Sequence, residues 1–464
     1  ICIIDKDGSL TYKEYYSRIL KYAAVIKGYG IKKGDCVVIK SAQSSMFLAA
    51  VHAVHAVSAV AVPLEKNVKE ERLTDIATQT SAALIISDCA YEGFGTVLYN
   101  ELDEGEKEFE IASFPKRSDV STILFTTGTT GKSKGVTVAH RVDCATGGNV
   151  QHGVGITADT REIIPMPLNH SFAIRRYYAN MLAGSSVILL DGVVFVNKFF
   201  ECFDKFGANA VGIAPSALSI IFKLSEDKIG EYKDVIDYVE LGSAHLPQED
   251  KDRLKALLPN SRLYNIYGSS EAGTACVLNF NSEDDKPYCI GRDSVNSKIA
   301  FIDEDGNIFD ATEEHPGKII TGGDIIMEGY YNEKELTDET LIDGYIHSND
   351  LGYRDEKGLV FMLGRIDDVI ISGGNKISPF EVEDLCLKYK GVTDCACLGK
   401  KDELMGEIPV LFATVNESYS ESELASFLHD KLEAFQVPKQ IIIIESIPRT
   451  YNGKILKREL KKLL

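Results

Sequence analysis

A short loop that combines glycine, hydroxyl and lysine side chains carries the clearest chemical signal in the sequence. It follows an apolar stretch at residues 120–125 and comprises, in order, Thr126, Thr127, Gly128, Thr129, Thr130, Gly131, Lys132, Ser133, Lys134 and Gly135. Glycines let the backbone turn its N–H groups toward a bound anion, hydroxyls donate further hydrogen bonds, and lysines supply positive charge. We therefore predict a loop that binds phosphate groups.

This loop is not a Walker A motif, although it contains the run Gly131-Lys132-Ser133. A Walker A motif requires a glycine at the position where Thr126 stands. A polar surface turn is the plainer alternative, but ordinary turns seldom concentrate these residue types directly after an apolar strand. The sequence therefore favours a phosphate-binding loop of a different kind.

The segments around the loop alternate between short apolar strands and helices, which predicts an α/β fold. Strands are expected at residues 37–39, 59–62, 84–86, 123–125, 187–190, 211–213, 235–241 and 263–266. Thr11 and Glu14 form a capping-box pattern, so a helix is expected to begin there. Polar loops directly follow several of the strands, and ligands bind at the carboxyl ends of strands in such sheets.

The chain has 464 residues, which is too long for a single core, so we expect at least two domains. From about residue 285, short strands alternate with turns, which predicts an antiparallel, β-barrel-like subdomain. A compact segment with its own strands and helices follows Ile366. We predict a large N-terminal domain of layered α/β subdomains at residues 1–366 and a small, mobile α+β C-terminal domain at residues 367–464.

The composition excludes several kinds of partner. A net charge of −19 argues against nucleic acid and against an anionic membrane surface. The apolar run at residues 46–62 carries two histidines and is followed by Pro63, so we interpret it as a helix and a strand rather than a membrane span. Ten scattered cysteines and the lack of a signal-peptide pattern predict a reduced, cytoplasmic protein without a disulfide framework.

Six further motifs follow the phosphate-binding loop in the order that is typical of one family. They are residues 267–271 (similar to Y-G-x-T-E), 317–332 (similar to G-E-L…G-Y-x-N), Asp350 (the acid of T-G-D), 364–383 (a hinge block), 432–438 and Asn452-Gly453-Lys454 (N-G-K). The chain thus resembles, over essentially its whole length, the adenylate-forming (AMP-binding) superfamily, which includes acyl-CoA synthetases, peptide-synthetase adenylation domains and firefly luciferases. Three positions depart from the pattern: Asn349 replaces the glycine of T-G-D, Ser270 replaces the threonine before Glu271, and Ser58 stands where a glycine usually follows the second helix.

The resemblance implies a site for ATP and Mg²⁺. The loop would contact the β- and γ-phosphates, and Glu271 would bind Mg²⁺, because this hard cation prefers carboxylate oxygen. Tyr267 would stack on the adenine, and Asn265 would read its exocyclic amine. The other residues implied at the nucleotide are Gly242, Ser243, Ala244, Gly268, Ser269, Ser270, Asp350 at the ribose hydroxyls, and Arg365 near the ribose and phosphates. Plainer interpretations remain for three of these side chains. Glu271 could be a carboxylate at a helix N-terminus, Tyr267 an ordinary buried tyrosine, and Asn265 an ordinary turn residue.

The resemblance gives Lys454 the central catalytic role. It would bridge the substrate carboxylate and the α-phosphate, which removes the repulsion between two anions that must meet. Taken alone, a lysine after Asn-Gly near a chain end is usually a solvated surface charge. The family also implies that the C-terminal domain rotates about Asp367 between two half-reactions, so that the loop at Gly373 and Gly374 approaches the thiol. The plainer interpretation of Asp367 is a turn residue at a strand end.

The implied reaction joins a carboxylic acid to a thiol in two steps, through an acyl-adenylate. Amino-acid-activating members of the family have an aspartate near position 170, whereas residues 168–172 of this chain contain no acid. We therefore expect an acid without an α-amine. His170 would flank the acyl group, with an ordinary half-buried histidine as the alternative. Arg175 and Arg176 follow on a predicted helix and are expected at the surface; the alternative is that one of them points at the pocket, which would suit an acidic or polar acyl group.

Three functions remain open on this basis. The first is an acyl- or aryl-CoA synthetase, with a small-molecule acid, ATP, Mg²⁺ and CoA as its ligands. The second is a stand-alone adenylation enzyme that loads the phosphopantetheine thiol of a separate carrier protein. The third is a nucleotide-binding protein without catalysis, and the presence of Glu271, Asp350 and Lys454 together argues against it.

Overall fold

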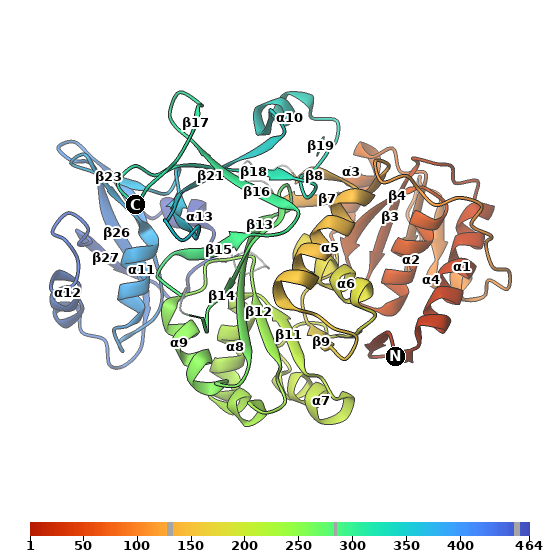
Figure 1. Ribbon diagram of the computed structural model, residues 1–464, viewed down its shortest axis with the longest axis horizontal. Helices are drawn as coiled ribbons and strands as arrows, with labels where there is room; N and C mark the ends of the chain where they lie inside the picture. Colours follow the sequence, from red (N-terminus) through yellow and green to blue (C-terminus); the bar gives the residue numbers. More distant parts are fainter. Residues whose placement is uncertain (128–132, 283–284, 450–454) are drawn as a thin grey trace.

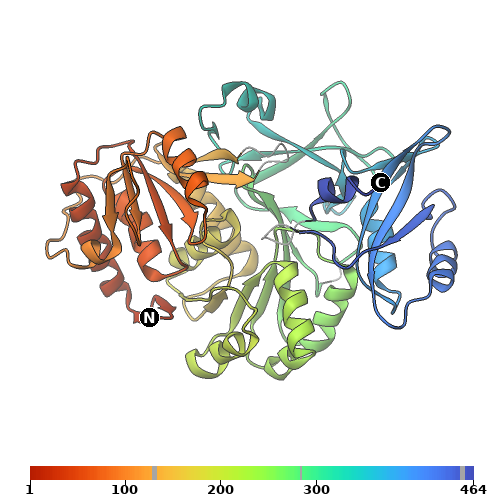
Figure 2. The same cartoon turned by 180° about the vertical axis from the view of Figure 1, so that it is seen from behind.

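The computed structural model describes residues 1–127, 133–282, 285–449 and 455–464. These residues form three β-sheets with helices packed on them, and the C-terminal sheet lies at one end of the molecule (Figure 1). The predicted α/β fold class is confirmed, with a large N-terminal part and a smaller C-terminal part. Figure 2 shows the C-terminal sheet at the end of the molecule opposite the N-terminus.

A seven-stranded sheet contains the predicted phosphate-binding loop. From edge to edge its strands are β19 (Gly329–Tyr330), β8 (Ser133–Ala139), β7 (Val120–Thr127), β4 (Val60–Glu65), β3 (Cys36–Ser41), β5 (Leu84–Ser87) and β6 (Thr96–Leu98). The strands from β7 to β6 are parallel, and β8 returns antiparallel beside β7. The loop connects β7 to β8, and its residues 128–132 lie outside the described part of the chain.

A fifteen-stranded sheet forms the centre of the molecule. Across it run β17 (Ile308–Phe309), β16 (Ser297–Ile302), β18 (Gly317–Gly323), β21 (Tyr345–Arg354), β22 (Val360–Arg365), β15 (Cys289–Asp293), β14 (Gly273–Asn279), β13 (Arg262–Ser269), β12 (Tyr238–Leu241), β11 (Ala210–Ile213), β9 (Arg161–Ile164), β10 (Ser186–Leu189), β1 (Ile3–Asp5) and β2 (Gly8–Leu10), with β20 (Leu341–Ile342) on β21. The strands from β13 to β1 are parallel. The antiparallel strands expected from about residue 285 form the other end.

The third sheet belongs to the C-terminal part and has its own buried core. Its strands are β24 (Asn375–Ile377), β23 (Ile370–Ser372), β26 (Gly406–Val415) and β25 (Val392–Asp402), with β27 (Gln440–Ile443) parallel to β26. The first of these strands in the sequence begins four residues after Ile366. The domain boundary at Asp367 itself stays a prediction.

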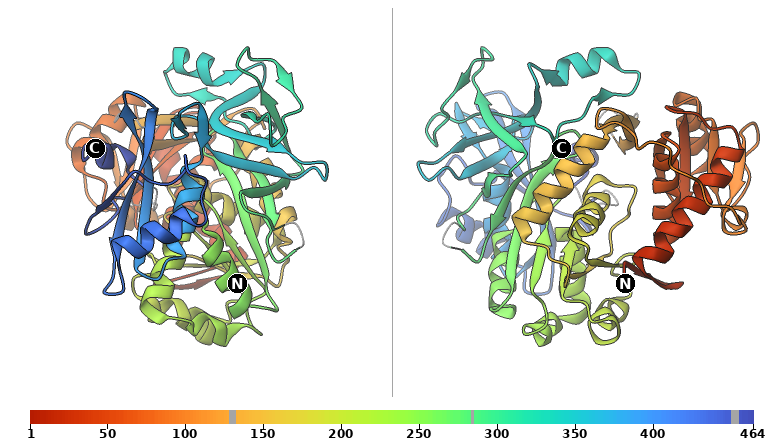
Figure 3. Two further views of the ribbon diagram at one scale, coloured as in Figure 1. Left: turned by 90° about the vertical axis from the view of Figure 1, so that its left-hand side faces the viewer. Right: turned by 45° about the vertical axis from the view of Figure 1, so that its right-hand side comes forward.

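Helices pack on all three sheets and on one another. They are α1 (Tyr12–Gly28), α2 (Ser45–Ala56), α3 (Glu70–Gln79), α4 (Tyr99–Asp103), α5 (His140–Val154), α6 (Ser171–Ala183), α7 (Val196–Phe206), α8 (Pro215–Ser225), α9 (Gln248–Leu257), α10 (Lys334–Thr340), α11 (Pro379–Leu387), α12 (Glu421–His429) and α13 (Lys457–Lys461). The predicted capping box is confirmed, because Thr11 and Glu14 exchange hydrogen bonds at the start of α1. Helices α5 and α6 pack on each other between the two large sheets (Figure 3).

The structure describes all ten cysteines and the apolar run at residues 46–62. All ten cysteines are free thiols, and eight of them are buried. The apolar run at residues 46–62 forms α2 and the start of β4, as expected. Within the described residues, every helix is too short or too polar to cross a lipid bilayer.

Candidate active site

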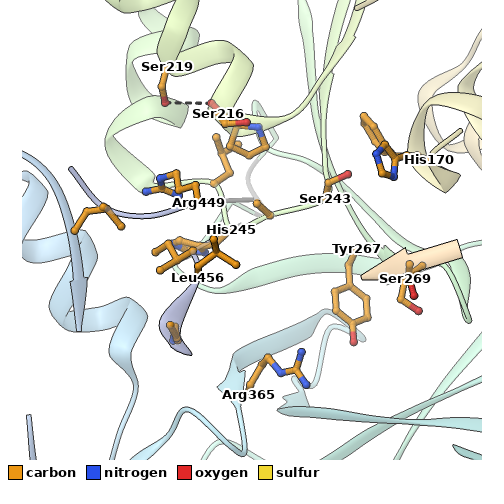
Figure 4. A pocket seen from close by; sticks show the side chains of 18 of the residues that line it. His170, Ser216, Ser219, Ser243, His245, Tyr267, Ser269, Arg365, Arg449 and Leu456 are labelled. Carbon is orange, nitrogen blue, oxygen red and sulfur yellow. Dashed lines mark hydrogen bonds between the residues drawn. The ribbon is translucent and has the colours of Figure 1, made fainter. Parts of the chain in front are cut away.

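One large cleft, with a volume of about 2870 Å³, collects most of the residues that the sequence singled out. Its walls follow the carboxyl ends of parallel strands from both large sheets, where α/β proteins bind ligands. Residues that illustrate this placement are Gln43 after β3, Lys66 after β4, Thr126 in β7, His170 after β9, Ser216 after β11, Ser243 after β12 and Ser270 after β13. The C-terminal part closes one side of the cleft, with Arg449 and Leu456 near Ser216 and Ser219 of α8 (Figure 4).

Tyr267 and Asp350 form a hydrogen-bonded pair on the cleft wall. The Tyr267 hydroxyl donates to Asp350 Oδ2 at 2.5 Å, which joins β13 to β21. Burial, and next the negative charge of Asp350, raise the pKa of Tyr267 well above its ordinary value, so the phenol stays protonated and can donate. Asp350 is also the cross-strand partner of Arg365 on β22. These three side chains, predicted separately for adenine, ribose and phosphate, therefore lie together.

Asn265 presents an acceptor that the described residues leave unused. Its side-chain oxygen is buried and receives no hydrogen bond from the described part of the chain, while the residue lines the cleft. A buried acceptor without a donor costs free energy, which a ligand that carries an N–H group would recover. This is the geometry that the sequence predicted for a residue that reads an exocyclic amine.

The segment at Gly242, Ser243 and Ala244 follows strand β12 and reaches the cleft wall. Ser243 has φ = 78°, a backbone conformation that non-glycine residues seldom adopt and that often marks functional sites. Ser243 and Ala244 line the cleft, whereas Gly242 is not among the lining residues. A Cβ atom at Gly242 would lie 2.7 Å from the Phe172 ring and 2.6 Å from Ile266, so only glycine fits there.

Glu271 lies in the middle of the turn between β13 and β14 and also lines the cleft. Its Oε1 accepts a hydrogen bond from the Tyr330 hydroxyl at 2.9 Å. The Lys134 ammonium, at the end of the phosphate-binding loop, lies 5.6 Å from the centre of the Tyr330 ring. Tyr330 therefore connects the loop to the predicted metal ligand. The sequence comparison noted Tyr330 within a motif but gave it no role.

A single carboxylate at this position fits Mg²⁺ better than it fits a metal held by the protein alone. The described residues contain no cluster of three or more histidine, cysteine, aspartate or glutamate side chains that could hold a metal ion. Mg²⁺ commonly binds through one or two carboxylates together with the phosphates of its substrate. Glu271 beside a phosphate-binding loop matches that pattern.

His170 lies in the cleft, at the position just before helix α6 (Figure 4). The expectation that Arg175 and Arg176 lie at the surface is wrong. Arg175 is 5% exposed and Arg176 is 0% exposed, because α6 is covered on both sides. Arg176 forms ion pairs with Glu162 and Glu240 inside the sheet. Glu162 and Glu240 lie on strands that are far apart in the sequence, so the residues around Arg176 could not predict these ion pairs.

The predicted residues of the C-terminal part divide into two groups. Arg365 and Asp367 line the cleft, whereas Gly373 and Gly374 form the turn between β23 and β24 and are not among the lining residues. Lys454 lies outside the described residues, and its neighbour Ile455 lines the cleft. Ile455, rather than the glycine turn, thus borders the cleft.

His245 connects the two parts of the molecule and was missed in the sequence. Its Nε2 lies 2.9 Å from Asp384 Oδ1 on α11, and its ring stacks on Phe380 with centres 4.5 Å apart. His245 directly follows the predicted adenine-binding segment, so this contact lies next to the cleft. No local pattern could have revealed it, because the partners are more than 130 residues away in the chain.

Comparisons with known proteins agree with this geometry. The family model "AMP-binding enzyme" matches residues 1–331, and the model "AMP-binding enzyme C-terminal domain" matches residues 381–454. The chain belongs to the AMP-binding enzyme family, which confirms the resemblance seen in the sequence.

The similar proteins cover essentially the whole chain. A 2-succinylbenzoate–CoA ligase from Bacillus cytotoxicus is 27% identical, over 100% of this chain and 96% of its own length. The crystal structure of ATP-bound MatB from Rhodopseudomonas palustris matches this protein with a TM-score of 0.91 and 22% sequence identity, over 100% of this chain and 95% of that one. O-succinylbenzoate coenzyme A synthetase (MenE) from Bacillus subtilis, in complex with ATP and magnesium ion, gives 0.88 at 22% identity, over 99% and 96%. These structures share the fold of this protein.

Proposed function

We propose that this protein is an ATP-dependent ligase that joins a carboxylic acid to CoA. The acid attacks the α-phosphate of ATP, which gives an acyl-adenylate and pyrophosphate. The CoA thiol then attacks the acyl carbon, a thioester forms, and AMP leaves. The family membership and the names of the curated relatives, which are 2-succinylbenzoate–CoA ligases, support this reaction class.

The observation that supports the proposal is a group of side chains on one wall of the cleft whose chemistry suits a nucleoside. Asn265 supplies a buried acceptor without a donor, suited to the exocyclic amine of adenine. Tyr267 offers an aromatic face beside it, and Asp350 offers carboxylate oxygen for the ribose hydroxyls. Ser243 and Ala244 also line the cleft, and their small side chains suit a flat ring laid against the backbone.

The phosphates extend from the nucleoside toward Lys134 and the phosphate-binding loop, with Glu271 as the magnesium ligand. The bound cation neutralises charge on the phosphates and orients them. Tyr330 holds Glu271 Oε1 and fixes the direction of the carboxylate. Lys454 places its ammonium between the acid and the α-phosphate, so that the two anions can approach. This role rests on its position in the N-G-K motif.

The acid pocket lies beyond the α-phosphate, beside His170. The neighbouring Asn169 donates to Glu65 Oε2 at 2.9 Å, and Arg72 lies 3.6 Å from the other oxygen of Glu65. The Glu65 carboxylate is thus already engaged and is a poor partner for a substrate amine. An acid without an α-amine is therefore the proposed substrate class, and 2-succinylbenzoate is the first compound to test because the relatives are named for it.

The proposed acceptor is CoA, and a carrier-protein phosphopantetheine carries the same thiol and is the alternative. We also place the protein in the cytoplasm, where a reducing environment maintains its ten free thiols. Hinge motion about Asp367 would bring the turn at Gly373 and Gly374 toward the thiol in the second half-reaction.

The decisive experiment measures pyrophosphate release from Mg-ATP with a panel of carboxylic acids that includes 2-succinylbenzoate, malonate, aryl acids, fatty acids and amino acids. We expect one chemical class of acid to support release, and CoA to convert the product to thioester with release of AMP. Glu271→Ala should lose this activity. If a folded preparation releases no pyrophosphate with any acid, the proposed function is wrong. If a carrier protein but not CoA accelerates AMP release, the alternative acceptor is correct.

A further inference from the structure

We propose that Arg175 is a positioning residue for ATP activation, because its guanidinium holds the turn that carries Glu271. The inference rests on the proposed function only for the identity of the ligand, Mg-ATP. Nothing in the family motifs points to this arginine, and the sequence had suggested a surface position for it. In the structure, Arg175 instead donates hydrogen bonds to the backbone next to Glu271, the predicted metal ligand.

Arg175 makes a two-pronged contact with the turn. Its Nη1 donates to the carbonyl oxygen of Ser269 at 2.7 Å, and its Nη2 donates to the carbonyl oxygen of Ser270 at 2.9 Å. The residue is 5% exposed, so water does not compete strongly for these donors. Hydrogen bonds from a charged donor in a rigid fork are stronger and more directional than those from a neutral side chain. The two carbonyls belong to the residues immediately before Glu271.

The turn itself is short, and its other hydrogen bonds within the described residues come from neutral groups. Strand β13 ends at Ser269 and β14 begins at Gly273, so Glu271 lies in the middle of a three-residue connection. Ser269 Oγ accepts from the Ala272 N–H at 3.0 Å, and the Glu271 carbonyl accepts from the Met327 N–H at 2.8 Å. Arg175, on helix α6, therefore adds hydrogen bonds from a charged donor to this turn.

Helix α6 is itself anchored, which makes it a firm support. The next residue, Arg176, reaches between strands to pair with Glu162 on β9 and Glu240 on β12. A Cβ atom at Gly212, on the strand β11 that separates them, would collide with both Glu162 and Arg176. The glycine thus makes room for the pair. One arginine fixes the helix to the sheet, and Arg175 uses that fixed helix to hold the turn.

The charge of Arg175 acts in the same direction as its hydrogen bonds. Burial lowers its pKa to about 10, while the negative charges of Asp143 and Glu271 oppose that shift, so the guanidinium is a cation at neutral pH. The buried cation and the Glu271 carboxylate therefore attract each other, while the Tyr330 hydroxyl donates to the same carboxylate. Groups that orient a metal-binding carboxylate usually affect metal affinity by about 10- to 100-fold.

Helix α6 also lies between the proposed sites of the two substrates, the acid and Mg-ATP. The helix begins at Ser171, directly after His170 at the proposed acid pocket, and Ser171 Oγ lies 3.1 Å from Ser270 Oγ. The same helix therefore borders the acid and holds the turn that binds the metal. Movement of α6 on loss of Arg175 would affect ATP activation before it affects attack by the thiol.

The test compares Arg175→Met and Arg175→Lys with the wild-type protein and with Arg161→Met. Arg161 is a matched control, because its Nη1 also donates to a backbone carbonyl, that of Phe206 at 3.0 Å, but this carbonyl belongs to α7 and not to the turn that carries Glu271. Three quantities are measured: the Mg²⁺ concentration for half-maximal pyrophosphate release, the KM values for ATP and for the acid, and thioester formation from supplied acyl-adenylate.

We expect Arg175→Met to raise the required Mg²⁺ concentration by about tenfold and to slow adenylate formation by about 10- to 100-fold. Thioester formation from supplied acyl-adenylate should stay within about twofold of wild type, because that step uses no Mg-ATP. Arg175→Lys should lie between, since it keeps the charge but loses the fork. Arg161→Met should behave as wild type. Added guanidinium ion should partly restore an Arg175→Ala variant.

The proposal is overturned if the variants lose both half-reactions equally with unchanged Mg²⁺ dependence, or if they lose neither. If Arg175→Met does not fold, Arg175→Lys gives the same comparison. If the wild-type protein forms no adenylate with any acid, the proposed function fails separately. Calorimetric binding of ATP with and without Mg²⁺ then still tests Arg175, because its loss should weaken binding only when Mg²⁺ is present.

Discussion

The side-chain amide of Asn349 donates a hydrogen bond to Asp367 Oδ2 at 2.9 Å. Arg365 approaches the same oxygen at 3.8 Å. Asn349 occupies the position where the adenylate-forming motif has glycine. The side chain that replaces this glycine therefore contacts Asp367, the residue predicted as the hinge. The contact exists in an arrangement in which Ile455, next to Lys454, lines the cleft. Asn349 should therefore favour the arrangement for adenylate formation.

Asn349→Ala should slow adenylate formation by about threefold and leave thioester formation from supplied acyl-adenylate unchanged. An exposed hydrogen bond of this kind contributes about 0.5–1 kcal/mol, which sets the size of the effect. Asn349→Asp should show a larger effect in the same direction, because it places two carboxylates together. Single-turnover rates of the two half-reactions measure this. An unchanged ratio of the two rates in both variants would show that Asn349 does not bias the hinge.

Asn265→Ala should raise the KM for ATP by about tenfold, since a hydrogen bond to a buried acceptor contributes about 1–2 kcal/mol. The KM for the acid should not change. The sharper test uses purine riboside triphosphate, which lacks the exocyclic amine. Wild type should discriminate against it, and Asn265→Ala should not. Asn260→Ala is the control, because that amide pairs with Asp234 at the surface. Equal discrimination by both proteins would refute the assigned contact.

Lys454→Ala should reduce carboxylate-dependent pyrophosphate exchange by at least about 100-fold, because the repulsion between the acid and the α-phosphate is no longer offset. Thioester formation from supplied acyl-adenylate should stay largely intact. Lys462→Ala is the control, since its ammonium pairs with Glu459 near the same chain end. Similar losses in both half-reactions would contradict a lysine that serves only the first.

The free energy of unfolding should fall as the pH drops from 6.5 toward 4. Burial lowers the pKa of His52 to about 4, with a smaller effect from His140, and the ring contacts the Tyr177 hydroxyl at 3.0 Å. The unfolded chain therefore binds more protons than the folded protein within this window, which favours unfolding. This stability is fully present above pH 6.5 and is lost toward pH 4.

His52→Gln should remove about 1–2 kcal/mol of the difference in stability between pH 7.5 and pH 5. Urea denaturation at the two pH values measures it. His315→Gln, at an exposed position, should leave the difference as in wild type. A His52→Gln protein with the same pH dependence as wild type would show that the ring is not held neutral by burial.

The sequence predicted most of the strands and the nucleotide residues, because both leave local signals. Apolar runs followed by polar loops placed Ser243, Tyr267 and Glu271 at strand ends, and β12, β13 and the following turn are where they were expected. Ordered motifs then linked these loops to one ligand. Local patterning is enough where the chemistry lies within a few consecutive residues.

The contacts between distant segments could not be predicted in this way. The arginines of α6 looked like surface charges, because a lysine or arginine in a helix is usually solvated. Their partners at Glu162, Glu240 and Ser269 become neighbours only when the sheet forms. The pairing of His245 with Asp384 likewise depends on how the C-terminal part lies on the cleft.

Strand β19 completes the seven-stranded sheet from far along the chain. Gly329 and Tyr330 pair with Thr137 and Val136 of β8, and Tyr331 donates to the Gly135 carbonyl at 2.7 Å. A shortened protein that stops before Gly329 would leave the backbone of β8 bare, and an open strand edge invites self-association. Segments as distant as residues 136 and 330 must therefore be kept in one polypeptide when this enzyme is divided for expression or fused to other proteins.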